Sequence, residues 1–259
     1  GLSGKGIKAQ AFDRPVTAEI AAEGKPGDNV TRIVANGQIT VKRLTDWLNV
    51  TQPLPVSGDL PYQLQLILDS KDSPLVINST LKGVAIDLPA PFGKTADQER
   101  PSEFRMTLQG AERRLGAAYN DQANFAFAAP NGKFAEGRGE LYLGRGGAIV
   151  PDAKGLRIRG ELSELDIAPW QELAARYTGN DPGGNAKQLL NSVDLQIGKL
   201  TAMGTTLNDV RVQLQRNAAA WALSLDSALA KGTATLPDAK SAPIGVNMLY
   251  VRLPASDPT

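Results

Sequence analysis

The stretch Tyr62-Gln63-Leu64-Gln65-Leu66-Ile67-Leu68 decides the fold of this chain, because apolar and polar residues alternate along most of it. Side chains point alternately to the two faces of a strand, so Leu64, Leu66 and Leu68 share one face. The pattern predicts a β-strand with one apolar face. Segments on both sides of this stretch show the same alternation.

These segments are separated by turn residues and contain apolar residues two positions apart. The predicted strands lie at 75–88, 104–108, 125–127, 141–143, 156–158, 193–197, 210–214 and 221–225. The first is long, and Gly83 indicates a bulge within it. Because strand follows strand with little between them, the sequence predicts an antiparallel meander rather than βαβ units.

One segment has a clear helical period. In residues 167–177 the side chains of Trp170, Leu173 and Tyr177 recur at helical spacing. Asp166 and Pro169 suit the start of this helix. A shorter helical turn is expected around residues 45–48, so the sequence predicts one or two short helices.

The two helical places belong to similar segments. A run from Gly37 to Trp47 matches a run from Gly160 to Trp170, with the same spacing and the same strand-to-helix pattern. The match predicts a weak internal repeat over about residues 30–90 and 155–225, and repeats are typical of extended architectures. The alternative is a chance match between two β-rich segments.

Composition excludes several classes of function. The chain has 259 residues, 28 Lys plus Arg against 27 Asp plus Glu, and a net charge of +1, which argues against nucleic-acid binding. It has no histidine and no cysteine, which excludes His- or Cys-based metal sites, haem, iron–sulfur clusters and Cys nucleophiles. No signal peptide and no apolar run of about 18 residues is present. The abrupt ends predict an internal piece of a longer polypeptide.

The candidate catalytic motifs fail on their context. Ser79-Thr80-Leu81-Lys82 matches S-x-x-K, but that chemistry needs a helix and this segment alternates as a strand. Gly144-Arg145-Gly146-Gly147 lacks the spacing of a phosphate-binding loop and predicts a hairpin turn. Glu161, Glu164 and Asp166 lie beside arginines and predict a solvated ion-pair cluster. We therefore expect no enzyme activity, no metal and no cofactor.

The apolar faces of the strands leave two architectures open. In an ordinary sandwich, two such faces close on each other and form a plain core. In an open, curved sheet, they would line an apolar groove that suits acyl chains. Periodicity does not distinguish these two architectures, and taken alone the apolar faces favour the plain core.

One stretch carries a specific resemblance. The segment Leu81-Lys82-Gly83-Val84-Ala85-Ile86-Asp87-Leu88-Pro89-Ala90-Pro91-Phe92-Gly93-Lys94 resembles a segment of the AsmA-like proteins of the YhdP type. The run from Pro53 to Tyr62, the helix entry from Leu165 to Trp170, and the later runs 194–198 and 208–210 are similar to the same family. These anchors span roughly residues 37 to 225, which is most of the chain.

The resemblance implies a fold and a function. It implies a mainly β fold, in which a long, curved and twisted antiparallel sheet forms an open hydrophobic groove over residues 1–259. Such proteins are anchored in the inner membrane of Gram-negative bacteria, cross the periplasm and are implicated in moving phospholipids toward the outer membrane. The chain would then be a middle segment without a membrane span of its own, and residues 89–101 would form a polar loop at the rim. The family offers no catalytic motif.

From this resemblance we expect phospholipid acyl chains as ligands, with inner- and outer-membrane proteins as further partners. The alternative function is a non-catalytic periplasmic scaffold that binds a protein partner at a sheet edge. The predicted groove-lining residues are apolar and lie on predicted strands; they are Leu64, Leu66, Leu68, Ile77, Ile86, Met106, Phe125, Phe127, Leu195, Val212 and Leu223. Some of them would instead form plain core under the helices.

Overall fold

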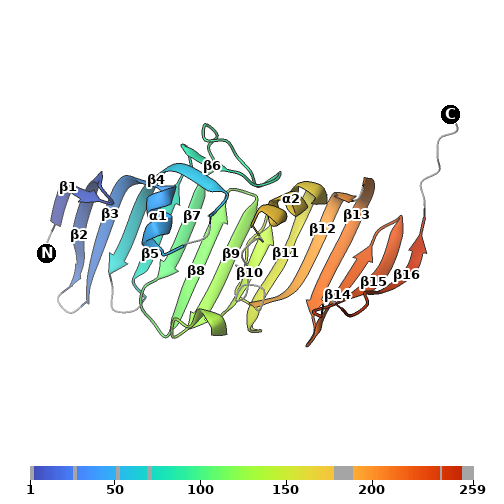
Figure 1. Cartoon of the computed structure of the whole chain (residues 1–259). Helices are drawn as coiled ribbons and strands as arrows, with labels where there is room; N and C mark the ends of the chain where they lie inside the picture. Colours follow the sequence, from blue (N-terminus) through green and yellow to red (C-terminus); the bar gives the residue numbers. More distant parts are fainter. Residues whose placement is uncertain are drawn as a thin grey trace.

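The computed structural model describes residues 3–25, 28–50, 53–68, 72–177, 189–202, 204–239 and 241–252. Within these residues the chain forms one long open sheet with two short helices (Figure 1). The strands are β1 Ser3–Ala11, β2 Arg14–Lys25, β3 Asp28–Thr40, β4 Val56–Leu68, β5 Pro74–Ser79, β6 Val84–Ile86, β7 Ser102–Thr107, β8 Glu112–Tyr119, β9 Ala123–Pro130, β10 Arg138–Leu143, β11 Gly155–Asp166, β12 Leu190–Ala202, β13 Thr205–Arg216, β14 Ala220–Asp226, β15 Ala230–Pro237 and β16 Gly245–Val251. The helices are α1 Val41–Trp47 and α2 Ile167–Tyr177, with a 3-10 turn η1 at Phe134–Glu136.

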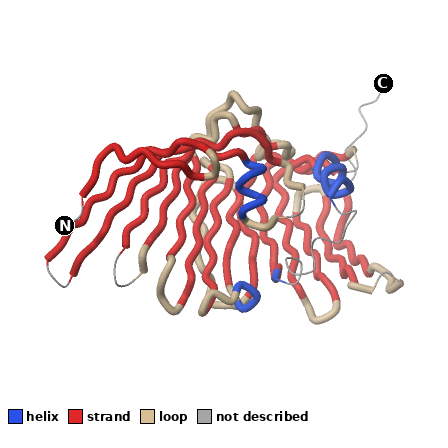
Figure 2. The backbone as a smooth tube through the Cα atoms, turned by 60° about the vertical axis from the view of Figure 1, so that its left-hand side comes forward, coloured by secondary structure: helices blue, strands red, loops and turns tan. Residues whose placement is uncertain are grey.

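The strands lie in sequence order across the sheet, from β1 at one edge to β16 at the other, and only β6 leaves this path to pair with β4. Figure 2 shows them as a single curved layer that does not close on itself. The prediction of a mainly β chain with a long, curved, open sheet is confirmed, as are the two short helices.

Two pairings contradict the prediction of a purely antiparallel meander. β11 runs parallel to both of its neighbours, β10 and β12, while all other pairs are antiparallel among the described strands. A parallel pair needs a crossover connection, and here residues 144–154 and α2 lie in the two connections. The glycine run at 144–147 therefore begins a crossover and is not the predicted hairpin turn.

The prediction of one long strand over residues 75–88 is also wrong. β5 ends at Ser79, and the chain reverses through Leu81 and Gly83, whose φ angles are +54° and +92°. Positive φ at two closely spaced residues is incompatible with a continuous strand, and glycine adopts it at little cost. After the reversal, β6 pairs with the first residues of β4.

Both helices begin where a strand ends in a capping residue. The Thr40 hydroxyl accepts a hydrogen bond from the Arg43 amide at the start of α1. Asp166 does the same for the Ala168 amide at the start of α2, as its position in the sequence predicted. The strands that flank the two helices pair differently. β3 and β4, on either side of α1, are antiparallel, whereas β11 and β12, on either side of α2, are parallel. The division of the chain into a weak repeat stays a prediction.

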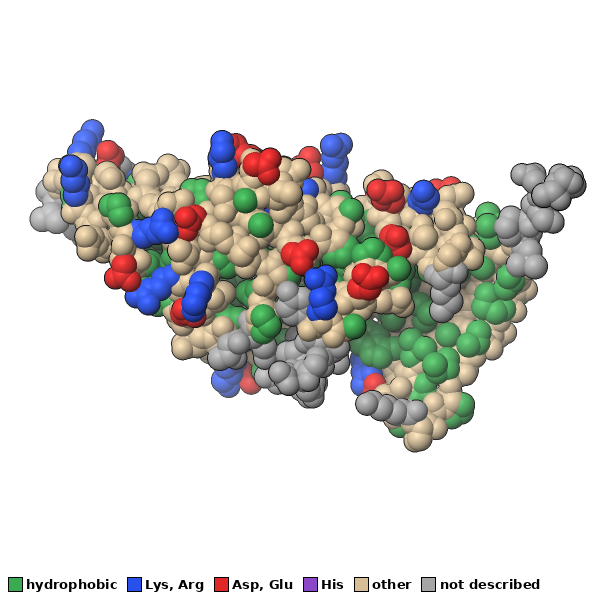
Figure 3. Space-filling model, turned by 45° about the horizontal axis from the view of Figure 1, so that its top comes forward, with side chains coloured by type: hydrophobic (Ala, Val, Ile, Leu, Met, Phe, Trp, Pro, Cys, Tyr) green, Lys and Arg blue, Asp and Glu red, His purple; other side chains and the backbone are tan. Residues whose placement is uncertain are grey.

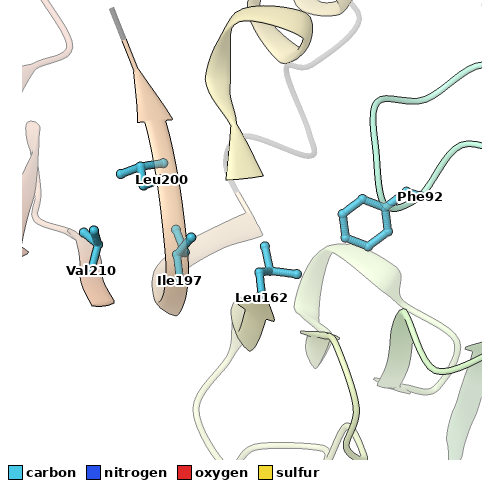
Figure 4. Packing of buried hydrophobic residues seen from close by; sticks show 5 residues of the cluster. All are labelled: Phe92, Leu162, Ile197, Leu200 and Val210. Carbon is cyan, nitrogen blue, oxygen red and sulfur yellow. The ribbon is translucent and has the colours of Figure 1, made fainter. Parts of the chain in front are cut away.

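The best-packed core lies under one end of β11, β12 and β13. It contains Phe92, Leu162, Ile197, Leu200 and Val210, each at most 7% exposed. Phe92 reaches this cluster from the loop that follows β6, and Figure 4 shows its ring close to Leu162. This contact brings a distant part of the chain onto the apolar face of the sheet.

Candidate functional site

A row of apolar side chains crosses the whole sheet. Residues that are partners in neighbouring strands share a face, so the registers trace one row from β1 to β16. This central row contains Ile7, Ala18, Ala35, Leu64, Ile77, Phe104, Ala117, Phe125, Leu141, Ile158, Val193, Leu214, Leu223, Ala234 and Val246. Every residue in it is apolar.

The opposite face has the reverse character. One of the two rows next to the central row points to the other side of the sheet and is almost all polar from β2 to β16. It contains Thr17, Asn36, Gln63, Asn78, Glu103, Ala118, Asn124, Tyr142, Arg159, Asp194, Gln213, Ser224, Thr233 and Asn247. The sheet therefore has one apolar face, and a polar row runs along the opposite face, which we call the hydrated face.

The apolar face is open over much of its area. Most side chains of the central row are half-buried, and Ile7, Phe104 and Val246 are 38%, 36% and 64% exposed. Figure 3 shows hydrophobic side chains gathered in the hollow near the C-terminal strands. A closed sandwich would bury these positions, so the exposed fractions exclude a plain two-sheet core within the described residues.

The structure places all eleven predicted groove residues on this apolar face. Leu64, Ile77, Phe125 and Leu223 belong to the central row. Leu66, Leu68, Met106, Phe127, Leu195 and Val212 lie in the rows beside it, and Ile86 lies on β6 over the face. Only Phe127 is fully buried, and Leu68 is exposed. Lipid contact at these positions stays a prediction.

A segment that we call the strap lies over this face. It comprises residues 84–100, from β6 to the start of β7. Ile86 and Lys94 exchange backbone hydrogen bonds of 2.9 and 3.0 Å, which closes the strap into a narrow loop. The resemblance implied a polar loop at the rim for residues 89–101, but Phe92 within it is 7% exposed and packs into the core cluster.

A buried lysine, a half-buried arginine and a tyrosine hold the strap in place. The Lys94 ammonium donates to the carbonyl oxygens of Leu81 and Val84, and burial lowers its pKa, with the nearby Arg100 charge adding to the effect. Arg100 donates to the Pro91 carbonyl at 2.9 Å and to the Tyr119 hydroxyl at 3.1 Å. The Tyr119 hydroxyl in turn donates to the Phe92 carbonyl at 2.8 Å, and burial raises its pKa. The strap is thus fixed to β8.

Two apolar cavities adjoin under and beside the strap. The larger, of about 550 Å³, lies between the strap, α2 and the sheet, and its lining consists of Val56, Ile86, Leu88, Phe92, Tyr119, Ala123, Leu141, Leu143, Leu162, Leu165, Ile167, Trp170 and Leu195. The smaller, of about 350 Å³, lies over β4 to β10 and shares Tyr119, Ala123 and Leu141 with it. Together they follow the rows of the apolar face from β4 to β12.

The family model of the YhdP protein matches residues 1–259. The chain belongs to the YhdP family. No curated protein and no solved structure gives a significant match to it. Membership of the YhdP family indicates an envelope-associated protein, in agreement with the resemblance carried by residues 81–94.

The described part of this YhdP-family chain holds the S-x-x-K residues in structural contacts. It contains no group of three or more acidic residues that could hold a metal ion. The Ser79 hydroxyl donates to the Pro61 carbonyl, and Lys82 forms an ion pair with Glu99 at 3.1 Å, so the S-x-x-K residues have separate structural partners. No described helix has the length and apolar character needed to cross a membrane.

The ion pairs of the hydrated face differ from the predicted cluster. Arg157 and Arg159 both pair with Glu140, which is 1% exposed and also accepts a hydrogen bond from the Ile149 amide. The crossover at 144–154 therefore lies on the hydrated face and covers Glu140. Period-two reasoning missed Glu140, because a single glutamate between Gly139 and Leu141 carries no signal of burial.

Sequence reasoning also missed several residues of this YhdP-family site. Phe92 and Trp170 form an edge-to-face pair, with ring centroids 5.8 Å apart, although they lie far apart in the sequence. Tyr119 and Leu162 line the larger cavity beside them. The apolar alternation in β8 and β11 could have identified the last two, but only the tertiary fold reveals the approach of the Phe92 loop to α2.

Proposed function

We propose that the apolar face is an open groove that binds phospholipid acyl chains, and that this chain is a middle segment of a phospholipid conduit across the envelope. The observation that carries the proposal is the central apolar row, which continues without a polar interruption from β1 to β16. Membership of the YhdP family fits a role in lipid transfer at the level of the family.

The physical reason is the cost of exposing lipid tails. Transfer of one CH₂ group from water to an apolar environment is favourable by about 0.8 kcal/mol of free energy. A continuous apolar row offers this favourable free energy at every strand, so no single position along the row traps the acyl chain. Hydrocarbon has nothing to hydrogen-bond, so the groove would select weakly among acyl chains, and a net charge of +1 would not retain anionic head groups strongly.

The protein would act without catalysis and within the periplasm, with the full-length protein anchored in the inner membrane. The alternative is a structural scaffold that binds protein partners through its sheet edges. Each of β1 and β16 pairs with one neighbour only, which leaves an edge available under both functions. Bound lipid distinguishes them.

The first test is native mass spectrometry of the purified chain, together with extraction and identification of bound lipid. Phospholipid at a reproducible stoichiometry supports the groove. A stable, monodisperse and lipid-free protein contradicts it and supports the scaffold.

The second test places a charge in the groove and the same charge on the opposite face. Leu223→Glu changes the central row, and Ser224→Glu changes the next residue, which points to the hydrated face. We expect Leu223→Glu to remove most of the bound lipid while thermal unfolding stays cooperative. Ser224→Glu should bind lipid like the parent chain. Equal lipid content in the two variants would contradict the proposal, and unfolding of Leu223→Glu alone would indicate a core position.

A further inference from the structure

The strap and α2 approach each other across the apolar face from distant parts of the sequence. Their contact contains the Phe92–Trp170 ring pair and an ion pair between Asp87 and Arg176 at 3.2 Å. The ion pair is exposed, with side-chain exposures of 75% and 58%, so it contributes little to stability. This contact forms part of the wall of the larger cavity, which remains open to solvent elsewhere.

The closed contact has a built-in weakness. The indole nitrogen of Trp170 is buried and has no hydrogen-bond partner. A buried N–H without a partner loses its hydrogen bond to water, so the closed arrangement carries a desolvation cost that opening would remove. The strap itself is well braced by Lys94 and Arg100, whereas its contact with α2 consists of the ring pair, apolar packing around Leu88 and the exposed ion pair.

We propose that the strap and α2 form a gate over the groove, and that the cavity beneath it binds a single hydrocarbon chain of a phospholipid. The hydrocarbon chain of the lipid enters and leaves this site when Phe92 separates from Trp170. This inference rests on the proposed function, because it assigns a regulated binding site to one part of the same groove.

The chemistry of the lining selects a hydrocarbon chain rather than a head group. Two lining side chains carry a polar atom. The Tyr119 hydroxyl already donates to the Phe92 carbonyl and accepts from Arg100, and the Trp170 indole offers a single N–H donor. A phosphate head group needs many more partners than one donor and would lose most of its hydration in this cavity. A volume of about 550 Å³ is within the range of small-ligand cavities.

Continuity with the open groove supports the same occupant. The cavity floor contains Leu141 of the central row and Leu195 of the row beside it. The smaller cavity continues from the same floor toward Ile77 on β5. An acyl chain that lies along the rows would therefore pass beneath the strap. Rows farther from the strap remain open to the second acyl chain and the head group of the same lipid.

The test uses the absence of cysteine in the chain. Asp87→Cys and Arg176→Cys together allow a short bis-methanethiosulfonate reagent to tie the strap to α2, and a reductant releases the tie. Arg211→Cys with Asp194→Cys is the matched control, because this pair joins β12 and β13 on the hydrated face without crossing the groove.

The probe is phospholipid with a photoreactive acyl chain, in vesicles of phosphatidylethanolamine and phosphatidylglycerol. Labelled peptides are mapped by mass spectrometry, comparing the cavity floor at Leu141 and Leu195 with the open row at Leu223. We expect the tie to slow labelling of the cavity floor at least about tenfold, which equals about 1.4 kcal/mol of barrier. Labelling at Leu223 should not change, reductant should restore the rate, and Phe92→Ala should speed it.

Each of the other outcomes would refute a specific part of the proposal or of its test. Equal labelling rates with and without the tie would refute the gate. Labelling at Leu223 but never on the cavity floor would refute the site beneath the strap and leave the open groove standing. A slowing of the same size in the Arg211/Asp194 control would assign the effect to the reagent. The absence of labelling anywhere would refute the proposed function as well.

Discussion

Replacing Phe92 with alanine should detach the strap from the sheet. The side chain is 93% removed from solvent and packs against Leu162 and Trp170. Burying a phenylalanine side chain is worth about 1.5 to 3 kcal/mol, and an edge-to-face ring pair adds about 0.5 to 1.5 kcal/mol. The measured range for Phe→Ala in cores, about 3 to 5 kcal/mol, includes the cavity left behind. We expect a cost of about 3 kcal/mol, expressed as opening of the strap.

Hydrogen exchange measures this opening directly. The Ile86 and Lys94 amides are bonded to each other's carbonyl oxygens, so they exchange when the strap opens. A change of about 3 kcal/mol corresponds to about a hundredfold faster exchange at these two amides. The amides that pair β14 with β15 lie far from the strap in the strand order, and their exchange should stay the same.

A second aromatic pair provides the matched control. Trp47 contacts Phe12 edge-to-face, with ring centroids 5.6 Å apart, but Trp47 is 63% exposed. Trp47→Ala keeps the strap intact and should cost less than about 1 kcal/mol. Unchanged exchange at Ile86 and Lys94 in Phe92→Ala would refute the reasoning that this ring anchors the strap. A loss of the same size in Trp47→Ala would show that ring contact, rather than burial, sets the magnitude.

The remaining predictions concern the hydrated face. Glu140→Gln should destabilise the chain by about 1.5 to 3 kcal/mol in urea unfolding, because the buried carboxylate loses its charge-assisted hydrogen bond from Arg157, whose own side chain is partly exposed. Glu136→Gln, at an exposed site, should cost less than about 0.5 kcal/mol. Hydrogen bonds from Arg211 lower the pKa of Asp194, so its ionised form stabilises the fold above the pKa of the unfolded chain, and this contribution is lost as the pH falls through the folded pKa. Asp194→Asn should therefore be less stable than the parent at pH 6, and the difference should vanish at acid pH; a difference independent of pH would contradict the assignment.

The sequence predicted most strands between β4 and β14 and their faces, because both depend on local alternation, but β1, β2, β8, β15 and β16 were not among the predicted strands. Leu64, Leu66 and Leu68 share the apolar face as the period of two requires, and the same rule placed Val212 and Leu223 correctly. The α2 helix was equally predictable, since Asp166 caps it and its apolar residues recur at helical spacing. These features need no knowledge of distant contacts.

The crossovers and the strap were not predictable in the same way. Glycines at 144–147 suit a hairpin and a crossover equally, and the choice of a parallel partner for β10 depends on the rest of the sheet. Just before the strap, the alternation from Leu75 to Leu81 resumes with a shifted phase from Val84 to Leu88, and a bulge at Gly83 fits that shift as well as a reversal does. Apolar residues on the two sides of the reversal line adjoining cavities, so the pattern did not show that the strand had ended.

The apolar face is open because the segments that cover it are shorter than the central row. Among the described segments other than strands, the strap, α1, α2 and the short η1 turn lie along the apolar side, and together they are much shorter than the sheet. Where Phe92 and α2 meet the sheet, Leu162 and Ile197 are buried, whereas Val246 at the last strand is 64% exposed. Exposed apolar surface of this extent is unusual in a monomer and indicates a binding surface. Because the row is apolar at every strand, including those without cover, the ligand that suits it is itself long and apolar, and a localised protein contact would leave most of the row in water.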